Sequence, residues 1–245
     1  MIRTEALSRM FGSLVAVDGV SLSLPAGARH ALIGPNGAGK TTLINLLAGA
    51  LAPTAGEVFL GDEKITRLAM HERVKRGLAR TYQVSQLFPG LTVLESVLLA
   101  IHERRGVGST WMREAQSRED VDEARELLSR LRIDSDAGKR AATLPYGRQR
   151  IVEIALALAT RPRILLLDEP AAGIPIAESA EILGVVDRLP GDVTILFIEH
   201  DMGLVFRFAE RITVLVAGRI LVEGTPDEIV RDERVKAVYL GSEAA

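Results

Sequence analysis

The sequence predicts an α/β fold in which helices cover a mostly parallel β-sheet. Two near-continuous apolar runs, 164–167 and 194–198, each stop at acidic residues, as strands buried on both faces do. A third run, 28–33, stops at a glycine-rich turn that precedes a helical pattern. From about Thr92 to Thr160 the pattern is helical instead, so a helical segment interrupts the sheet.

The first third of the chain reads as short strands around one helix. Residues 20–24 alternate in the manner of a strand, and residues 57–60 form another strand that ends at the Gly61-Asp62 turn. The helix between them begins near Gly39, carries leucines at helical spacing and ends near Gly49.

Two helix signals and a hairpin follow. Thr92 is expected to cap a helix, with Glu95 at the capping-box position. Residues 117–131 place an apolar stripe beneath dense charges. Residues 212–217 and 220–223 then predict a β-hairpin.

Composition restricts the classes of function. The chain has 245 residues, 47% hydrophobic, enough for one core or a core with a subdomain. A net charge of −2 provides no overall positive field, so no nucleic-acid partner is expected. Basic residues gather within 67–80 and at 104–105, where solvated helix faces are the preferred interpretation. The absence of cysteine excludes disulfides and thiolate metal sites.

Neither a secretory signal nor a membrane span is expected. No apolar stretch follows a basic start at the N-terminus, and the longest apolar stretches are too short to cross a bilayer. We therefore expect a soluble protein that acts at a membrane only through a partner.

The strongest motif is Gly-Pro-Asn-Gly-Ala-Gly-Lys-Thr-Thr, residues 34–42, between a predicted strand and a predicted helix. Its glycines let backbone N–H groups converge on phosphate oxygens. Lys40 would reach the β- and γ-phosphates of ATP, and the Thr41 hydroxyl would ligate Mg²⁺. A glycine turn with a surface lysine is the weaker interpretation. The expected nucleotide-binding residues are Gly34, Pro35, Asn36, Gly37, Ala38, Gly39, Lys40, Thr41 and Thr42.

Polar residues at the ends of two later strands predict the hydrolytic groups. Asp168 could hold Mg²⁺ through water, and Glu169 could polarise the attacking water. His200 ends the next strand and could sense the γ-phosphate. Taken alone, an acidic strand end and a single histidine are more often structural.

Together and in this order, these residues resemble the ATPase subunit of ABC transporters over nearly the whole chain. The resemblance implies that Phe11 stacks on adenine, that Gln83 is the Q-loop glutamine and that His200 is the switch histidine. Catalytic roles are thereby expected for Lys40, Glu169 and His200, and metal contacts for Thr41, Gln83 and Asp168. The signature loop falls on Leu144, Pro145, Tyr146, Gly147, Arg148 and Gln149.

The resemblance also implies an architecture and partners. The fold would be a P-loop NTPase core of the ABC type, with an antiparallel β-subdomain and an inserted helical subdomain. One domain would span 1–245, with the core in 1–83 and 162–245 and the helical part in 84–161. Two such ATPases would enclose ATP and Mg²⁺ between the P-loop of one and the signature loop of the other, at the inner face of the cell membrane beneath permease subunits.

Further stretches resemble the importer ATPases for branched-chain amino acids. They are 80–83, 87–93, 169–173, 198–202, 223–228 and 238–241. That likeness implies a substrate-binding protein as an indirect partner but does not fix the solute. Urea or amide uptake and lipopolysaccharide export remain alternatives.

Two departures from the family pattern concern the dimer. Pro145 replaces the signature serine and lacks even a backbone N–H, although the helix N-terminus after Gly147, with Arg148 and Arg150, could offset part of the loss. Pro175 stands where the family has Asp or Asn. We therefore favour a heterodimer over a homodimer.

Other functions stay open at this point. A regulatory subunit that hardly hydrolyses ATP would fit Pro145 and Pro175, although Glu169 argues against it. A repair or translation ATPase lacks support, because the chain has no long coiled coil and no second cassette. For permease docking, the candidates are Leu87, Phe88 and Leu91, which could equally pack the helical subdomain.

Overall fold

The apolar runs form one six-stranded sheet in the order β11-β10-β4-β9-β8-β7. The computed structural model describes residues 1–81, 87–106, 117–174, 182, 184–186 and 188–240. All neighbouring strands of this sheet are parallel except the β10–β11 hairpin. The strands are β4 Arg29–Ile33, β7 Leu78–Arg80, β8 Ile164–Asp168, β9 Thr194–Ile198, β10 Arg211–Val216 and β11 Arg219–Gly224.

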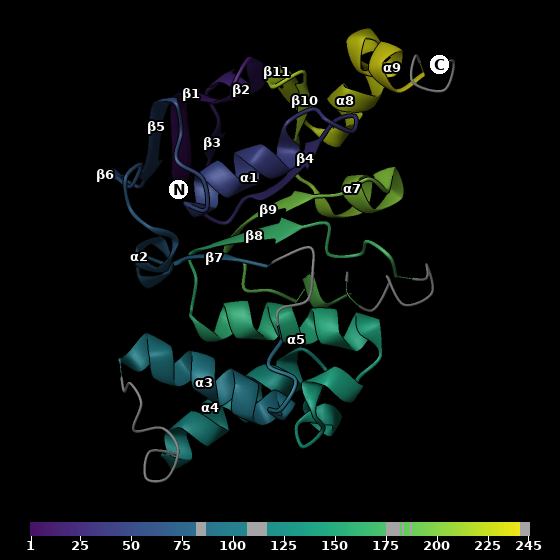
Figure 1. Ribbon diagram of the computed structural model, residues 1–245. Coiled ribbons are helices and arrows are strands. Elements are labelled where there is room, and N and C mark those ends of the chain that lie inside the picture. Colours follow the sequence, from purple (N-terminus) through teal and green to yellow (C-terminus); the bar gives the residue numbers. More distant parts are fainter. Residues whose placement is uncertain (82–86, 107–116, 175–181, 183, 187, 241–245) are drawn as a thin grey trace.

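Side chains of the central strands alternate between two hydrophobic cores. In β4, Ala31 and Ile33 belong to one core and Leu32 to the other, and β8 and β9 alternate in the same way. In Figure 1, α3, α4 and α5 lie below the sheet and α1 lies above it. Residues of α3, α4 and α5 belong to the first core, which also includes residues of α7, α8 and α9, and residues of α1 belong to the second. Burial on both faces explains why these strands read as unbroken apolar runs.

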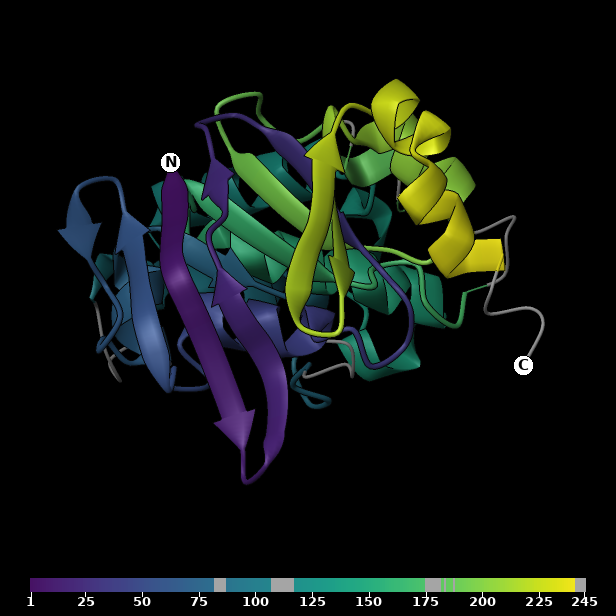
Figure 2. The ribbon, with the colours of Figure 1, turned by 90° about the horizontal axis from the view of Figure 1, so that it is seen from above.

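The N-terminal residues form a second, antiparallel sheet in the order β2-β1-β5-β6, with β3 also paired to β1. Figure 2 shows it beside the parallel sheet, with the β1–β2 hairpin extending outward. Its strands are β1 Ile2–Phe11, β2 Leu14–Val20, β3 Ser23–Leu24, β5 Ala55–Leu60 and β6 Glu63–Lys64.

The predicted strand over 20–24 is wrong as one element. β2 ends at Val20 and β3 starts at Ser23, because the Thr4 side chain replaces the regular ladder between them. The Thr4 hydroxyl donates to Val20 O and accepts from Leu22 N–H, both at 2.9 Å.

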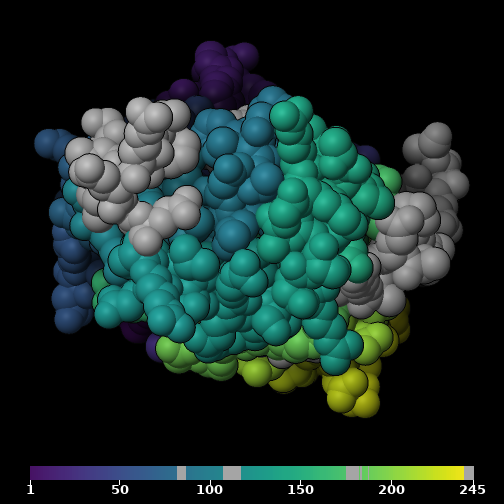
Figure 3. Space-filling model, turned by 90° about the horizontal axis from the view of Figure 1, so that it is seen from below, coloured from purple at the N-terminus to yellow at the C-terminus, as the bar shows by residue number. Residues whose placement is uncertain are grey.

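The helical segment lies between β7 and β8 in the sequence and covers one face of the sheet, as the view from below shows (Figure 3). The Thr92 capping box is confirmed: Thr92 N–H donates to Glu95 Oε2 at 2.7 Å and Glu95 N–H donates to Thr92 Oγ1 at 3.2 Å. The segment contains α3 Val93–Arg105, α4 Arg118–Arg130, α5 Tyr146–Ala159 and short 3₁₀ turns at Asp134–Asp136 and Ala141–Thr143. The subdomain boundaries at 83/84 and 161/162 stay a prediction.

The remaining helices surround the parallel sheet. They are α1 Lys40–Ala48, α2 Met70–Lys75, α7 Met202–Phe208, α8 Pro226–Arg231 and α9 Glu233–Leu240. The predicted helix ending at Gly49 is confirmed as α1, whose C-cap is Gly49 in the left-handed conformation. Within the part of the chain that the structure describes, none of the helices combines the length and apolar content needed to span a bilayer.

Arg73 contradicts the expectation of a solvated basic face. Its side chain is fully buried and donates to the carbonyls of Leu46 and Leu47, both at 2.7 Å, and of Thr66 at 2.9 Å. Burial lowers the pKa of the guanidinium to about 10, so it remains charged at neutral pH. This arginine satisfies carbonyls at the C-terminal end of α1 and so fixes the helix that begins at Lys40.

Candidate functional site

The glycine-rich loop leaves β4 in a conformation that requires glycine. Gly34 has φ +150°, and a Cβ there would lie 2.1 Å from Leu215 O. Gly39 has φ +100°, and a Cβ there would lie 2.2 Å from Ala16 O. The loop packs so tightly against its neighbours that neither position can accept a side chain. The loop leads directly into α1. Backbone N–H groups at such a helix start can bind phosphate.

Lys40 is the first residue of α1, and its side chain folds back over the loop. Its Nζ donates to Gly34 O at 2.7 Å and to Pro35 O at 3.0 Å. Burial lowers the pKa of the ammonium, while the nearby carboxylates of Glu169 and Asp168 raise it. The ammonium therefore sits among carbonyls and carboxylates, where an incoming phosphate could compete for it.

A cavity of about 560 Å³ lies beside this loop. Phe11, at the end of β1, lines it with a 43% exposed side chain, and the Arg9 guanidinium lies 4.6 Å from the centre of its ring. Glu169 and His200 line another part of the wall. The remaining lining residues are Leu14, Val15, Ala16, Asn36, Gly37, Ala38, Gly39, Lys40, Thr41, Thr42 and Ala217. The structure thus gathers most of the sequence-predicted site around one cavity.

Glu169 and His200 meet because β8 and β9 are adjacent parallel strands with Asp168 paired to Ile198. The residues that follow the two strands lie at the same sheet edge. His200 Nε2 and Glu169 Oε1 are 2.8 Å apart. Glu169 has φ +49°, unusual for a residue with a side chain, and its N–H donates to Ile198 O at 3.1 Å. A carboxylate held this way beside a phosphate-binding loop can accept a proton from water.

Asp168 lies deeper, and its side chain is only 2% exposed. Its Oδ2 accepts from Arg80 Nη2 at 2.9 Å, and Arg80 also donates to Asn45 Oδ1 on α1. Burial raises the pKa of the Asp168 carboxyl, and the Arg80 guanidinium opposes that rise. Among the described residues no partner reaches Asp168 Oδ1. A buried acceptor beside the loop that presents the Thr41 hydroxyl fits a hydrated Mg²⁺.

Two polar residues of the site were not predicted. Arg80 connects α1 to Asp168, and only its position next to the Q-loop stretch hinted at this contact. Glu199 is 5% exposed and accepts from the N–H groups of Ala171 at 3.1 Å and His200 at 3.2 Å. Burial raises the pKa of its carboxyl. Its sequence signal was a carboxylate directly after a buried strand, and its contacts join the turns that follow β8 and β9.

The predicted signature loop leads into α5, away from the cavity. Leu144 is buried, and Pro145 occupies the N-cap position without a side-chain hydrogen bond to the helix. The Gln149 side chain donates to Leu144 O at 2.9 Å, and its N–H donates to Pro145 O at 3.0 Å. Gly147 follows within the first helical turn. These contacts shape the loop, and it does not line the cavity formed by this chain's described residues.

Arg150, which was expected to help offset the missing serine, is buried in the helical layer. Arg150 is 3% exposed, pairs with Glu153 at 2.9 Å and donates to the hydroxyl of Tyr146 at 2.7 Å. Arg148 is also engaged within the chain, because it donates to Arg132 O at 3.0 Å. Tyr146, by contrast, is 41% exposed. Gln83 and Pro175 lie outside the described residues.

Comparison with known protein families decides the classification. The family model described as "ABC transporter" matches residues 17–172, which include the glycine-rich loop, the α3–α5 segment and β8. This chain belongs to the ABC transporter family. A second model, described as "Branched-chain amino acid ATP-binding cassette transporter", matches residues 219–245 of the cassette.

Relatives match the cassette over almost its whole length. It is 38% identical to the high-affinity branched-chain amino acid transport ATP-binding protein BraF of Pseudomonas aeruginosa, covering 98% of each chain. It is 39% identical to the corresponding LivG protein of Escherichia coli K12, again over 98% of each chain. The crystal structure of an ATP-binding cassette of an ABC transporter in its ADP conformation superposes with a TM-score of 0.85, at 32% identity and 98% coverage of both chains.

These findings confirm the predicted fold class and the resemblance to importer ATPases for branched-chain amino acids. The cassette binds nucleotide and is an ATPase, as the motifs predicted.

Proposed function

We propose that this cassette hydrolyses ATP to drive an importer of branched-chain amino acids, from the inner face of the cell membrane. The observation that supports the solute class is the match of residues 219–245 to the model described as "Branched-chain amino acid ATP-binding cassette transporter". The names of the two relatives agree with it. Urea or amide uptake and lipopolysaccharide export are the competing assignments for the same ATPase.

Each residue around the cavity has a proposed role. Phe11 stacks on the adenine, and the loop N–H groups with Lys40 hold the phosphates. Thr41 and Asp168, with Gln83, hold Mg²⁺, which when bound neutralises charge on the phosphate oxygens. Glu169 accepts the proton of the attacking water. His200 contacts Glu169 at 2.8 Å and so orients this carboxylate toward the γ-phosphate.

The second half of each site comes from another cassette. Residues 144–149 do not line the described cavity, so in our proposal they complete the site of a partner ATPase. Pro145 offers that site neither a hydroxyl nor an N–H, and Arg150 is buried. We therefore favour a heterodimer whose partner supplies a complete signature loop to Lys40, Asp168 and Glu169 of this chain.

Permease subunits are the proposed membrane partners, with a substrate-binding protein as an indirect one. Phe88 is 53% exposed, which favours a docking role for it, while Leu87 packs against the core of the helical layer. In our proposal Phe88 contacts the permease and Leu87 packs the helical layer, while both interpretations stay open for the half-buried Leu91. With a net charge of −2 we propose no nucleic-acid partner.

The assembly is tested by capture of the tagged cassette from detergent-solubilised membranes. Two permeases, a second ATPase and an amino-acid-binding protein should co-purify. The Phe88→Asp variant should lose the permeases, whereas Phe206→Asp, a 38% exposed phenylalanine on α7, should keep them. Recovery of lipopolysaccharide-export components, or of no membrane protein, would contradict the importer assignment.

The hydrolytic role is tested with Glu169→Gln in the assembled complex. Loss of ATP turnover with retained nucleotide binding is expected, since only the proton acceptor is removed. Unchanged turnover would favour the second candidate function, a regulatory subunit that binds ATP but hardly hydrolyses it, which Pro145 and Pro175 motivate.

A further inference from the structure

Glu199 is a buried carboxylate to which the proposed hydrolysis assigns no role. It follows β9 directly and is 5% exposed. Its Oε1 accepts from Ala171 N–H at 3.1 Å, and its Oε2 accepts from His200 N–H at 3.2 Å. Burial raises the pKa of this carboxyl, and the two backbone hydrogen bonds oppose the rise. One side chain thus connects the turn after β8 to the turn after β9, across 28 positions of the sequence.

The hydrogen bond to Ala171 reaches Glu169 through a tight turn. Ala172 N–H donates to Glu169 O at 3.1 Å, which closes the turn that contains Ala171. On its other side, Glu169 N–H donates to Ile198 O at 3.1 Å. The φ of Glu169 is +49°, and a residue with a side chain keeps such a φ only where its surroundings hold it. The position of Glu169 therefore depends on where Ala171 is held.

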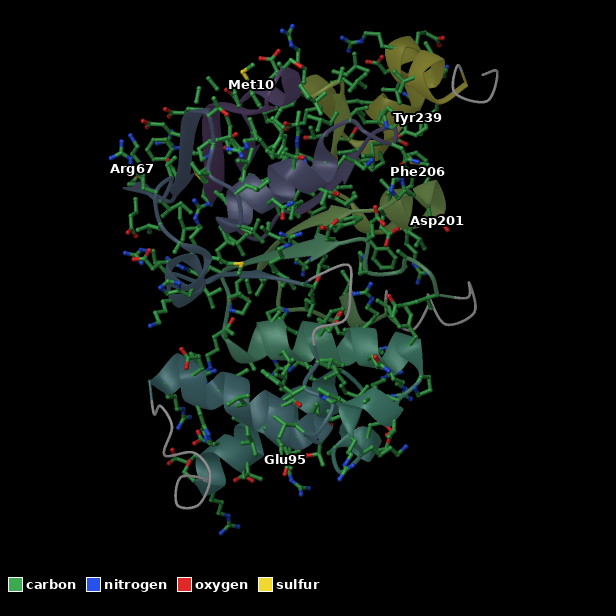
Figure 4. The ribbon with its side chains drawn as sticks, viewed as in Figure 1. Met10, Arg67, Glu95, Asp201, Phe206 and Tyr239 are labelled. Carbon is green, nitrogen blue, oxygen red and sulfur yellow. The ribbon has the colours of Figure 1, made fainter. Side chains whose placement is uncertain are left out.

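The second oxygen of Glu199 acts on His200. The His200 peptide lies between Glu199 and Asp201, and Asp201 Oδ1 accepts from Leu204 N–H at 3.2 Å as the N-cap of α7. Figure 4 labels Asp201 at this end of the sheet, where α7 begins. His200 Nε2 and Glu169 Oε1 are 2.8 Å apart, a contact that requires both turns in a fixed relative position. Glu199 thus holds the backbone beside both members of this pair.

The chemistry of a glutamate fits this place. Two N–H donors face the side chain, and a carboxylate offers two acceptor oxygens and no donor, whereas a glutamine amide offers one acceptor and one donor group. An aspartate has the same oxygens on a side chain that is one methylene shorter. Glutamate combines the two acceptors with the reach to Ala171.

We propose that Glu199 is a positioning residue for ATP hydrolysis, because its carboxylate bridges the turns after β8 and β9 and so keeps Glu169 and His200 aligned. Glu199 is not among the described residues that line the nucleotide cavity, so it acts through these two side chains. This inference rests on the proposed roles of Glu169 and His200 and is independent of the transported solute.

Turnover of the assembled complex tests the alignment. The Glu169→Gln complex gives the background, and the turnover above it belongs to the site of this chain. Glu199→Gln removes one acceptor, and Glu199→Asp keeps the charge but shortens the reach. In both variants we expect this part of kcat to fall about 10- to 100-fold, the range produced by displacing a catalytic group by up to about 1 Å. The KM for ATP and the number of fluorescent-nucleotide sites per chain should stay unchanged, because the phosphate-binding loop is untouched.

NMR of the full-length chain measures the contact with Ala171 directly. Carbonyl-¹³C proline with ¹⁵N-alanine gives two amide signals, from Ala26 and Ala171, because the Pro-Ala peptides of the sequence are 25–26 and 170–171. In Glu199→Asp the Ala171 signal should move upfield and its hydrogen exchange should accelerate, while the Ala26 signal stays in place. The retained charge means that this shift reports the contact itself.

Glu210→Gln is the matched control. Glu210 Oε2 also accepts from a backbone N–H, that of Arg29 at 3.3 Å, but at the end of β4 opposite the glycine-rich loop. This variant should leave kcat and the Ala171 signal unchanged. A kcat equal to that of the unaltered complex in either Glu199 variant, or an unmoved Ala171 signal, would refute the proposal. A loss of nucleotide sites that matches the loss of turnover would reduce Glu199 to a structural residue and refute its positioning role. Undiminished turnover in Glu169→Gln would instead contradict the proposed function.

Discussion

Arg80→Met removes the cation that faces Asp168 inside the protein. The Arg80 and Asp168 side chains are 8% and 2% exposed, with Nη2 and Oδ2 2.9 Å apart. Breaking such a buried pair by removing one partner costs about 3–5 kcal/mol, because the remaining charge is left without compensation. Burial already raises the pKa of the Asp168 carboxyl against the influence of Arg80. Uptake of a proton in the variant would therefore limit the loss, and we expect about 3 kcal/mol.

Urea unfolding followed by circular dichroism at neutral pH measures this loss. The matched control is Arg219→Met, since Arg219 pairs with Asp18 at 2.6 Å but the two side chains are 73% and 38% exposed. An exposed pair contributes at most about 1 kcal/mol. Adding Asp168→Asn to Arg80→Met should recover part of the stability, because the uncompensated charge disappears. A loss no larger than that of Arg219→Met, or no recovery in the double variant, would refute the reasoning.

Three further outcomes are expected. Gly34→Ala should abolish binding of a fluorescent nucleotide, because a Cβ at this position would lie 2.1 Å from Leu215 O. Gly90→Ala should bind the nucleotide normally, because no neighbouring atom lies within 4 Å of a Cβ at position 90. His30 has its pKa lowered by burial from 6.5 to about 4, so the unfolded state binds the extra proton and stability falls as pH drops from 6.5 toward 4. His30→Gln should remove about 2 kcal/mol of the stability difference between pH 7 and pH 5 in urea titrations, and an unchanged pH slope would contradict this. Thr92→Ala should cost about 1 kcal/mol in the same assay through loss of the α3 cap, and a loss below about 0.3 kcal/mol would contradict it.

The parts of the fold that sequence predicts are those set by local chemistry. Apolar runs with acidic ends predict the buried strands β8 and β9. The spacing of Thr92 to Glu95 predicts the start of α3. Lys40 is identified by the glycines around it. In each case the residues that determine the structure are neighbours in the chain.

The parts that escaped prediction depend on distant partners. The sequence around Arg73 does not distinguish it from a surface arginine, because its contacts are with the distant end of α1. The contact of Arg80 with Asp168 forms only because β7 pairs with β8. The break between β2 and β3 depends on Thr4 of another strand. Arg150 stands near the start of α5, and only the folded chain shows that its side chain is buried.

The order of strands in the parallel sheet has a consequence for synthesis on the ribosome. β4, which carries the glycine-rich loop, lies between β9 and β10, and these begin only at Thr194 and Arg211. About 160 residues must be added after β4 before its first neighbour exists, roughly 8–30 s at ordinary elongation rates. The antiparallel strands β1, β2 and β5 are complete within the first 60 residues and can pair much earlier. The nascent chain therefore carries an apolar strand without neighbours for most of its translation, and unpaired apolar strands of this kind are prone to aggregate.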